Sequence, residues 1–395
     1  MTKRAEIGII GCGNISEAYL RLAPTFSNVT IVAVADIVPA AAKARAEQFS
    51  LRALTVDRLL MDGEIEAVIN LTVPDAHYDV THAILSAGKH AYSEKPMALT
   101  AKKAAKLVAE ADRRGLKLGG APDTFLGAGA QLARRLIDEG KVGKVIAGAA
   151  NFLGHGMEHW HPDPTFFFQP GGGPVLDMGP YYITTLVGLL GAVKTVTAMG
   201  QMGFKQRIVT SQPNAGKKIK VNTPTTFNAI LEFASGAQIT FGTSWDVWKH
   251  GHANPIELYG TDGTMLVPDP NFFAGTVAYS AKGGDYTRVD SAGGNFGTAN
   301  WPWKGPHDRA NYRGLGVSDL IDAVRGKREP RCSGRLTAHV VEVMEAILIS
   351  AEKRSFIEIR STIDRPAPIT PAVAKRLLAA APAPRAVSES ASRSA

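Results

Sequence analysis

Residues 7–16 read Ile-Gly-Ile-Ile-Gly-Cys-Gly-Asn-Ile-Ser, an apolar run that ends in two closely spaced glycines. The run predicts a buried strand, and residues 15–22 predict the helix that follows it. Gly11 allows a tight turn between them, and Gly13 lets the backbone approach a pyrophosphate at the helix N-terminus. Ser16 replaces the third glycine of the pattern but is small enough to permit close packing. We expect a dinucleotide site lined by Gly11, Gly13, Asn14 and Ile15.

From this turn to about residue 125, short β-branched runs alternate with helical patterns. Strands that are connected by helices pair in parallel, so the alternation predicts a doubly wound parallel sheet of the Rossmann type. The predicted strands that follow the first are residues 29–35, 67–71, 90–92 and 116–118. The predicted helices between them are residues 40–49, 77–86 and 100–113.

After residue 125 the rhythm changes, because strand-like segments follow one another with few helices between them. These segments are residues 145–152, 193–199, 227–233, 237–244, 255–259 and 264–267. The turns Ser235-Gly236 and Asp262-Gly263 indicate hairpins, so we expect an antiparallel sheet in an α+β arrangement. Late helices over residues 318–324 and 336–352 are expected to cover that sheet.

This organisation predicts two domains and a tail. We expect an NAD-binding Rossmann domain at residues 1–125, a substrate-binding and oligomerisation domain at 126–375, and a disordered tail at 376–395. The tail is rich in alanine, proline, serine and arginine, a composition that buries too little apolar surface to fold.

Composition narrows the class of protein. Of 395 residues, 45% are hydrophobic and 20% charged, which is typical of a globular protein, and no apolar run approaches the ~20 residues that span a bilayer. The net charge of +8 is spread out rather than gathered in a basic stripe, so we expect no nucleic-acid or membrane partner. Cys12 and Cys332 are too few for a disulfide framework, which favours a cytoplasmic location.

The cofactor is expected to be NAD rather than NADP. Asp36 ends the second predicted strand, where a carboxylate accepts hydrogen bonds from the adenosine ribose and repels a 2′-phosphate. Thr72, Pro74 and His77 follow the third strand, at the sheet edge where ligands bind in such folds, and we expect them to contact the cofactor. Taken alone, His77 is more often an ordinary residue at the start of a helix.

A cation follows the fourth predicted strand, in the sequence Ser93-Glu94-Lys95-Pro96. This position places Lys95 where a nicotinamide ring could lie. An ammonium group stabilises the negative charge that develops on a carbinol oxygen during oxidation. Glu94 is expected to orient Lys95 or to contact the nicotinamide ribose. The alternative for this motif is a surface salt bridge before a turn.

A second cluster begins at the three glycines of residues 171–173, where Pro174 suits the first turn of a helix that ends at Gly191. Asp177 and Tyr181 are four residues apart, so they share one face of that helix. The alternative for Tyr181 is a half-buried aromatic side chain with its hydroxyl at a domain interface.

In this order, Gly11-x-Gly13, Asp36, Thr72-Val73-Pro74-x-x-His77 and Glu94-Lys95-Pro96 resemble the glucose–fructose oxidoreductase / inositol dehydrogenase / rhizopine-catabolism (Gfo/Idh/MocA) family, over about residues 5–370. The resemblance implies a Rossmann domain, then a domain with a large, open, mostly antiparallel sheet that joins copies into homodimers or homotetramers. It also implies that Asp177 accepts a substrate hydroxyl and that Tyr181 is the general acid/base, where many members carry histidine. Because free tyrosine titrates near ~10, Lys95 would have to favour its ionised form.

The substrate pocket is expected to include Asp123, at the domain junction, and His159 and Trp160, in a polar and aromatic segment. The histidines of that segment are irregularly spaced, so no metal is expected. His155, His161 and the group after Ser244, which includes Trp245, Asp246 and Trp248, remain alternative sources of an acid/base.

These residues predict an NAD-dependent dehydrogenase that acts on a secondary alcohol of a sugar, sugar derivative or cyclitol. Two alternatives stay open. One is an enzyme that retains NAD tightly and performs sugar–sugar oxidoreduction or redox-assisted glycoside cleavage. The other is a non-catalytic regulator that binds dinucleotide or sugar.

Overall fold

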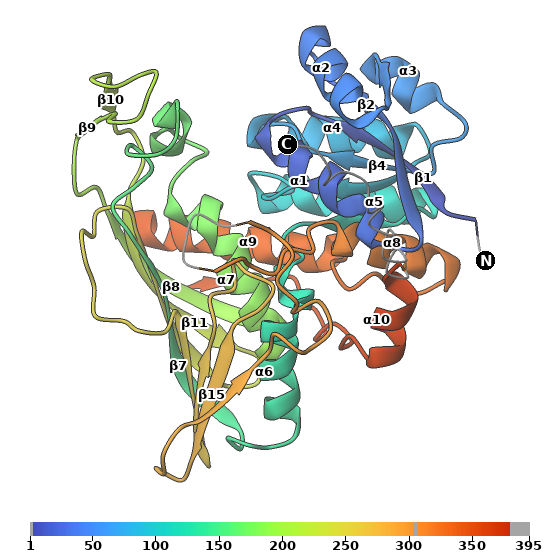
Figure 1. The fold of residues 1–395 in the computed structure, drawn as a ribbon. Coiled ribbons are helices and arrows are strands. Elements are labelled where there is room, and N and C mark those ends of the chain that lie inside the picture. Colours follow the sequence, from blue (N-terminus) through green and yellow to red (C-terminus); the bar gives the residue numbers. More distant parts are fainter. Residues whose placement is uncertain (1–2, 303–306, 380–395) are drawn as a thin grey trace, which may run out of the picture.

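A computed structural model describes residues 3–302 and 307–379, which form two large sheets with helices between and around them (Figure 1). The first sheet has the order β3-β2-β1-β4-β5-β6, and all of its pairs are parallel. Its strands are β1 (Ala5–Ile10), β2 (Val29–Ala35), β3 (Arg52–Leu54), β4 (Ala67–Asn70), β5 (His90–Ser93) and β6 (Leu118–Gly120). The predicted Rossmann sheet is confirmed, and its strand order reverses between β1 and β4, where such folds bind ligands.

The helices of this part are α1 (Asn14–Leu22), α2 (Pro39–Phe49), α3 (Val56–Met61), α4 (Pro74–Ser86) and α5 (Ala101–Arg114). Four elements differ from the prediction. Helix α4 begins at Pro74 rather than His77, because proline is already fixed in the φ that a first helical turn needs. Strand β6 begins at Leu118, and β3 and α3 were not predicted because elements this short carry little periodicity.

The second sheet has nine strands in the order β16-β15-β14-β13-β7-β12-β11-β8-β17. They are β7 (Val145–Leu153), β8 (Val193–Gln201), β11 (Thr226–Phe233), β12 (Gln238–Ser244), β13 (Ile256–Gly260), β14 (Gly263–Val267), β15 (Thr276–Ala281), β16 (Thr287–Asp290) and β17 (Ile357–Glu358). Both predicted hairpins are present, as β11–β12 and β13–β14. The nine-stranded sheet has one parallel pair, β12–β7, so it is mixed but mostly antiparallel, as expected.

Helices cover one face of this sheet. Figure 1 shows α6 (Ala128–Asp138), α7 (Pro174–Leu190) and α9 (Gly334–Lys353) on the side that faces the parallel sheet. Strand β11 alternates accordingly, with Phe227 and Leu231 buried and Asn228 and Ile230 exposed. The opposite face carries a groove of about 710 Å³ whose lining includes Met199, Asn228 and Ile230.

Helix α8 (Leu315–Arg325) corrects one expectation, because it packs against β2, β5 and β6 of the parallel sheet rather than covering the second sheet. Helix α10 (Pro371–Leu377) packs against α8, so the expected tail boundary at residue 376 falls inside a helix. Residues 380–395, most of that tail, lie outside the described residues. Three short 3-10 turns, η1 (Ala23–Thr25), η2 (Thr124–Leu126) and η3 (Pro164–Phe168), and a hairpin of β9 (Gln206–Ile208) and β10 (Lys218–Lys220) complete the fold.

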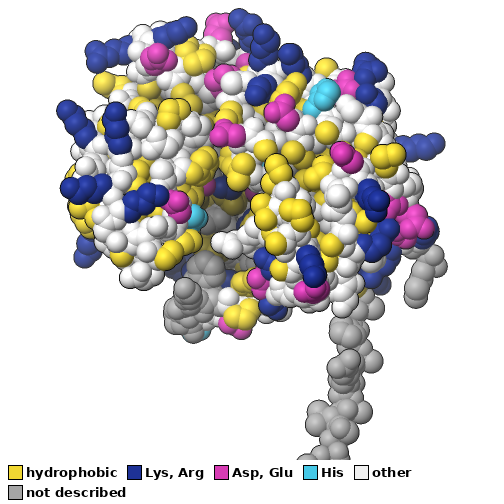
Figure 2. All heavy atoms as spheres, turned by 90° about the horizontal axis from the view of Figure 1, so that it is seen from above, with side chains coloured by type: hydrophobic (Ala, Val, Ile, Leu, Met, Phe, Trp, Pro, Cys, Tyr) yellow, Lys and Arg dark blue, Asp and Glu magenta, His cyan; other side chains and the backbone are white. Residues whose placement is uncertain are grey.

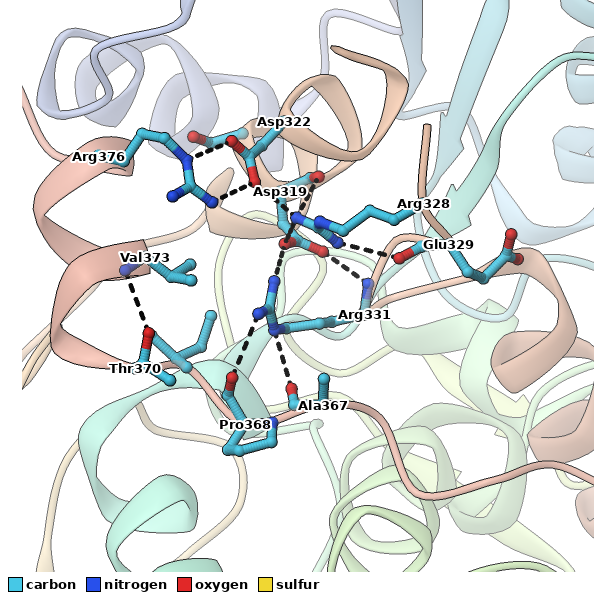
Figure 3. A network of polar contacts seen from close by, with 12 residues as sticks. Asp319, Asp322, Arg328, Glu329, Arg331, Ala367, Pro368, Thr370, Val373 and Arg376 are labelled. Atoms are coloured by element: carbon cyan, nitrogen blue, oxygen red, sulfur yellow. Dashed lines mark hydrogen bonds and ion pairs between the residues drawn. The ribbon is translucent and has the colours of Figure 1, made fainter. Parts of the chain in front are cut away.

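An ion-pair network ties α8 to the C-terminal segment (Figure 3). Asp319, whose side chain is buried, accepts from Arg331 and Arg328, and Arg331 also donates to the carbonyl of Ala367. The guanidinium of Arg376, with that of Arg328, lowers the pKa of Asp322 to about 2. These contacts hold α8 in place, and α8 in turn fixes the segment before it. No helix among the described residues is long and apolar enough to span a membrane.

Candidate active site

The structure brings Lys95, Asp177 and Tyr181 together from two distant parts of the chain. Lys95 follows β5, at the carboxyl edge of the parallel sheet, and its Nζ donates to Asp177 Oδ1 over 2.7 Å and to the Asp177 carbonyl over 2.9 Å. About a fifth of each side chain is exposed. Because an ammonium group has three N–H donors, one remains for a substrate oxygen.

Tyr181 lies one helical turn after Asp177 on α7, and Lys95 Nζ is 5.2 Å from the centre of its ring. The Tyr181 side chain is 5% exposed, and its hydroxyl makes no hydrogen bond within the described residues. Figure 2 shows a hollow in the surface on the side of the molecule that it presents. A charged lysine, a carboxylate and a phenol thus lie together in one cluster.

Electrostatics keep Lys95 charged. Burial acts to lower the pKa of Lys95, but the carboxylate of Asp177 outweighs it, with help from Tyr181 and Glu94, and the pKa lies above its ordinary value. Burial acts to raise the pKa of Glu94, but Arg313 and Lys95 outweigh it, and that pKa is lowered. The site therefore holds a stable cation and a stable buried anion side by side.

The Glu94 side chain is buried, and its carboxylate oxygens accept hydrogen bonds from other residues of the protein. Its Oε1 accepts from the Tyr19 hydroxyl over 3.0 Å and from Arg313 Nη1 over 3.3 Å, and its Oε2 accepts from the Lys95 backbone N–H over 3.0 Å. These contacts tie Glu94 to Tyr19, to Arg313 and to the backbone of Lys95. Tyr19 and Arg313 were not predicted, because neither belongs to a motif.

The glycine turn fits a dinucleotide. Gly11 has a φ of +104°, and a Cβ there would lie 2.5 Å from the Leu71 carbonyl, so only glycine suits the position. A Cβ on Gly13 would meet nothing within 4 Å, and no side chain caps α1, so its first N–H groups are open to a phosphate. Asn14 and Ile15 form the first turn of α1, and the buried Ser16 hydroxyl donates to the Gly13 carbonyl over 2.6 Å.

Asp36 is held beside this turn, where its Oδ2 accepts from the Cys12 N–H over 2.7 Å and its Oδ1 from the Val38 N–H over 2.8 Å. Each oxygen keeps a lone pair for a ribose hydroxyl. The carboxylate, the open helix N-terminus and the glycine backbone together suit an NAD that has two free ribose hydroxyls.

His77 joins the cofactor loop to the lysine loop. Its side chain is 1% exposed, with Nδ1 2.7 Å from the Pro96 carbonyl and Nε2 3.0 Å from the Thr72 carbonyl. Burial lowers the pKa of His77, although both carbonyls favour its protonated form. Thr72 also donates its hydroxyl to Asn70 Oδ1, and Pro74 begins α4. His77 thus ties the loop that follows β4 to the loop that follows β5.

Three residues were expected to line the substrate pocket. Asp123 lies inside the fold, and His159 and Trp160 lie apart from the cluster of Lys95, Asp177 and Tyr181. Asp123 is 2% exposed, and its Oδ2 accepts from the N–H groups of Gly314 and Gly316 at the start of α8. His159 and Trp160 are exposed on the loop between β7 and η3. Within the described residues, no hydrogen bond or ring contact joins these two to Lys95, Asp177 or Tyr181.

The alternative acid/base groups are occupied elsewhere. Arg207, from β9, is 4% exposed and pairs with Glu158 and Asp246, while His155 stacks on Trp248 with ring centres 3.2 Å apart. This cluster fixes the loop after β7 to the loop after β12. In the described part of the chain, no group of three or more His, Cys, Asp or Glu side chains is placed to hold a metal.

Comparison with known proteins identifies the family of the chain. Residues 5–120 match the profile described as "Oxidoreductase family, NAD-binding Rossmann fold", and residues 130–266 match the "GFO/IDH/MocA C-terminal domain". The chain is 26% identical to an inositol 2-dehydrogenase of Rhizobium meliloti over 72% of this chain and 80% of that protein. It is 34% identical to an inositol 2-dehydrogenase/D-chiro-inositol 3-dehydrogenase of Lactiplantibacillus plantarum over 36% of this chain, and spans 42% of that relative's length.

Solved structures share the fold. A levoglucosan dehydrogenase in complex with NADH and L-sorbose superposes with a TM-score of 0.76 at 20% identity, over 91% of this chain and all of the other. An NAD-binding oxidoreductase from Klebsiella pneumoniae gives 0.75 at 22% identity, over 90% of this chain and 99% of the other. At these identities the likeness establishes the arrangement of elements. With the matching family profile, it confirms an NAD-binding Rossmann fold.

Proposed function

The chain belongs to the Gfo/Idh/MocA oxidoreductase family, and from that premise we propose that it is an NAD-dependent dehydrogenase that oxidises a secondary alcohol of a sugar, sugar derivative or cyclitol. The observation that carries this proposal is the pairing of Lys95 Nζ with Asp177 over 2.7 Å, with Tyr181 beside it. A non-catalytic regulator has no need of a charged lysine, a phenol and a carboxylate that are gathered in one cluster.

Each residue then has a chemical task. When bound, NAD supplies the hydride acceptor. The free N–H of Lys95 donates to the carbinol oxygen and stabilises the charge that grows there. Tyr181, in its ionised form, takes the hydroxyl proton from the substrate, and Asp177 orients Lys95 and accepts a hydrogen bond from a neighbouring substrate hydroxyl. In the reverse direction, Tyr181 returns the proton.

The substrate class is supported by the relatives. Two that share sequence with this chain are inositol dehydrogenases, and a structural neighbour is a levoglucosan dehydrogenase solved with a sugar. All of these names describe polyhydroxylated rings or chains. The exposed Trp160 and His159 are proposed to reach such a substrate at the rim, because aromatic faces stack on sugar C–H groups while polar groups bind hydroxyls.

The test is an absorbance screen for NADH formation over inositols, aldoses, ketoses and anhydrosugars, run with NAD and with NADP. The proposal expects turnover of at least one polyol with NAD. A purified protein that carries NAD in equal amount, interconverts two sugars and releases no NADH would instead support the cofactor-retaining alternative. Binding of NAD or sugar without any redox change across the panel would support the regulator.

Cofactor preference tests the role of Asp36. In Asp36→Ser we expect KM for NAD to rise about 10- to 100-fold, because two charge-assisted hydrogen bonds to ribose are lost, while use of NADP improves. Initial rates with both cofactors measure this. Asp57→Ser removes an exposed carboxylate from α3 of the same part of the chain and should change neither value. A wild-type preference for NADP would contradict the assignment.

We also propose that a second copy of the chain covers the open face of the nine-stranded sheet. Met199 and Ile230 there are 71% and 46% exposed, on strands whose other face is buried. Light scattering on the purified chain should give the mass of two or four copies, and Ile230→Lys should lower it. A monomer at micromolar concentration would contradict this.

A further inference from the structure

We propose that Arg207 is a positioning residue for Asp177: the hairpin that Arg207 anchors keeps Asp177 against Lys95. This inference rests on the proposed function, in which Asp177 orients Lys95 and accepts a substrate hydroxyl. Arg207 lies on β9, in the hairpin of β9 and β10 that connects β8 to β11 (Figure 1), and belongs to no motif. Three sets of contacts, taken in turn below, join its side chain to the candidate site.

The guanidinium of Arg207 first ties the hairpin to two loops. Its side chain is buried, and Nη1 donates over 2.9 Å to Glu158 Oε1, on the loop after β7. Nη2 donates to the Trp245 carbonyl over 2.6 Å and to the carboxylate of Asp246, both just after β12. Because a guanidinium is a planar fork, two carboxylates at its two ends fix its orientation as well as its position. Arg207 therefore holds β9 in one place.

The hairpin in turn holds the segment that leads into α7. The Asn222 N–H, just after β10, donates to the Phe168 carbonyl over 2.9 Å, and the Asn222 side-chain amide donates to Gln169 Oε1 over 2.6 Å. Gln169 Nε2 donates back to the Lys220 carbonyl over 2.9 Å. The Phe168 ring is fully buried, with its centre 5.4 Å from Arg207 Cζ. Arg207 and the end of β10 thus hold Phe168 and Gln169 together.

A tight turn then carries this constraint to Asp177. The Gly173 N–H donates to the Phe167 carbonyl over 2.9 Å, and the Gly172 N–H donates to the Gln169 carbonyl over 2.9 Å. No side chain caps α7, and the Asp177 N–H donates to the Gly173 carbonyl over 3.1 Å. The place of Gly173, set by the segment before it, therefore determines where the first turn of α7 lies.

The first turn of α7 is the part of this helix that meets the candidate site. From Pro174 to Leu190, Asp177 is the one residue that is not buried. Its backbone carbonyl and its carboxylate both accept from Lys95 Nζ, over 2.9 Å and 2.7 Å. A shift of the turn would move both acceptors at once, and a misplacement of about 1 Å is enough to cost about 10²-fold in rate.

The test is steady-state kinetics with the polyol identified in the screen. Removing Arg207 alone would leave two buried carboxylates unpaired, so the variant is Arg207→Met/Glu158→Gln/Asp246→Asn, in which all three side chains are uncharged. We expect kcat/KM for the polyol to fall about 10- to 100-fold with a higher KM for the polyol, while KM for NAD stays within about twofold. Partial unfolding would lower kcat and leave both KM values unchanged, and that result would overturn the inference.

A second variant tests the link from the hairpin to α7 without removing a charge. Gln169→Ala deletes both side-chain hydrogen bonds between Gln169 and the end of β10, and should raise KM for the polyol about 3- to 10-fold. The matched control is Lys218→Met, which removes an exposed lysine from β10 and should leave every kinetic value unchanged. A KM for the polyol that stays at the wild-type value in Gln169→Ala and in the triple variant would also overturn the inference.

Hydrogen–deuterium exchange without substrate separates this inference from the proposed function. The amides of residues 175–178 should exchange about fivefold faster or more in the triple variant and in Gln169→Ala, while those of α1 keep the wild-type rate. This result is expected even if no polyol is ever oxidised, in which case the proposed function fails and the positioning of Asp177 stands. Exchange at residues 175–178 that is unchanged in both variants would overturn the positioning role whatever the substrate is.

Discussion

Replacing Lys95 with methionine is expected to lower kcat by at least about 10³-fold with NAD and the substrate found in the screen. Methionine fills a similar volume but cannot donate to the carbinol oxygen, and it leaves the carboxylate of Asp177 without its 2.7 Å partner. Steady-state NADH formation measures the loss. KM for NAD should change little, because the pyrophosphate and ribose contacts belong to the glycine turn and Asp36.

The matched control for this variant is Lys102→Met, which removes an exposed lysine from α5 of the same part of the chain. It should retain wild-type kcat. If Lys95→Met turns over within a few-fold of wild type, the lysine is not the group that stabilises the reacting oxygen.

Tyr181→Phe is expected to lower kcat by about 10²- to 10⁴-fold, the usual contribution of a general acid/base. Phenylalanine keeps the ring beside Lys95 Nζ and removes only the hydroxyl, so substrate affinity should be largely preserved. The rate that remains should also lack the rise with pH that is expected of wild type, because no group is left to ionise at that position. Initial rates as a function of pH measure both effects.

Tyr182→Phe is an unusually close control. Tyr182 is the next residue on α7, but its ring packs against Phe152 and Phe241 of the second sheet rather than on Lys95. It should change kcat by less than a few-fold. An equal loss in both variants would show that the helix, and not the Tyr181 hydroxyl, is responsible. If Tyr181→Phe alone stays active, another group moves the proton.

Much of the fold was predictable because its elements are long and strongly patterned. The parallel strands β2 and β4 are mostly apolar runs, and β11 alternates and is joined to β12 by Ser235-Gly236, so the existence of these strands and the β11–β12 pairing follow locally. The surface against which an amphipathic helix packs does not follow from local sequence. Helix α8 has a buried face, but the surface that buries it is decided by distant contacts such as Gly314 on Asp123.

The candidate site likewise has residues that the sequence predicts and residues that only the folded structure reveals. Gly11, Asp36, Lys95, Asp177 and Tyr181 belong to motifs whose spacing points to chemistry, and the structure places the last three in one cluster. Tyr19, Arg313 and Asn70 act through contacts that only the folded chain makes, so no local pattern reveals them. Asp123 shows the converse: a carboxylate at the expected junction proves to anchor a helix.

The most direct test of the central claim is the fate of the hydrogen on the substrate's carbinol carbon. The polyol identified in the screen is labelled with deuterium at that carbon, and the nicotinamide product is analysed by mass spectrometry for wild type and Lys95→Met. We expect labelled NADH from wild type and almost none from the variant. Unlabelled NADH, or labelled NADH formed equally fast by both proteins, would contradict hydride transfer at the Lys95–Tyr181 site.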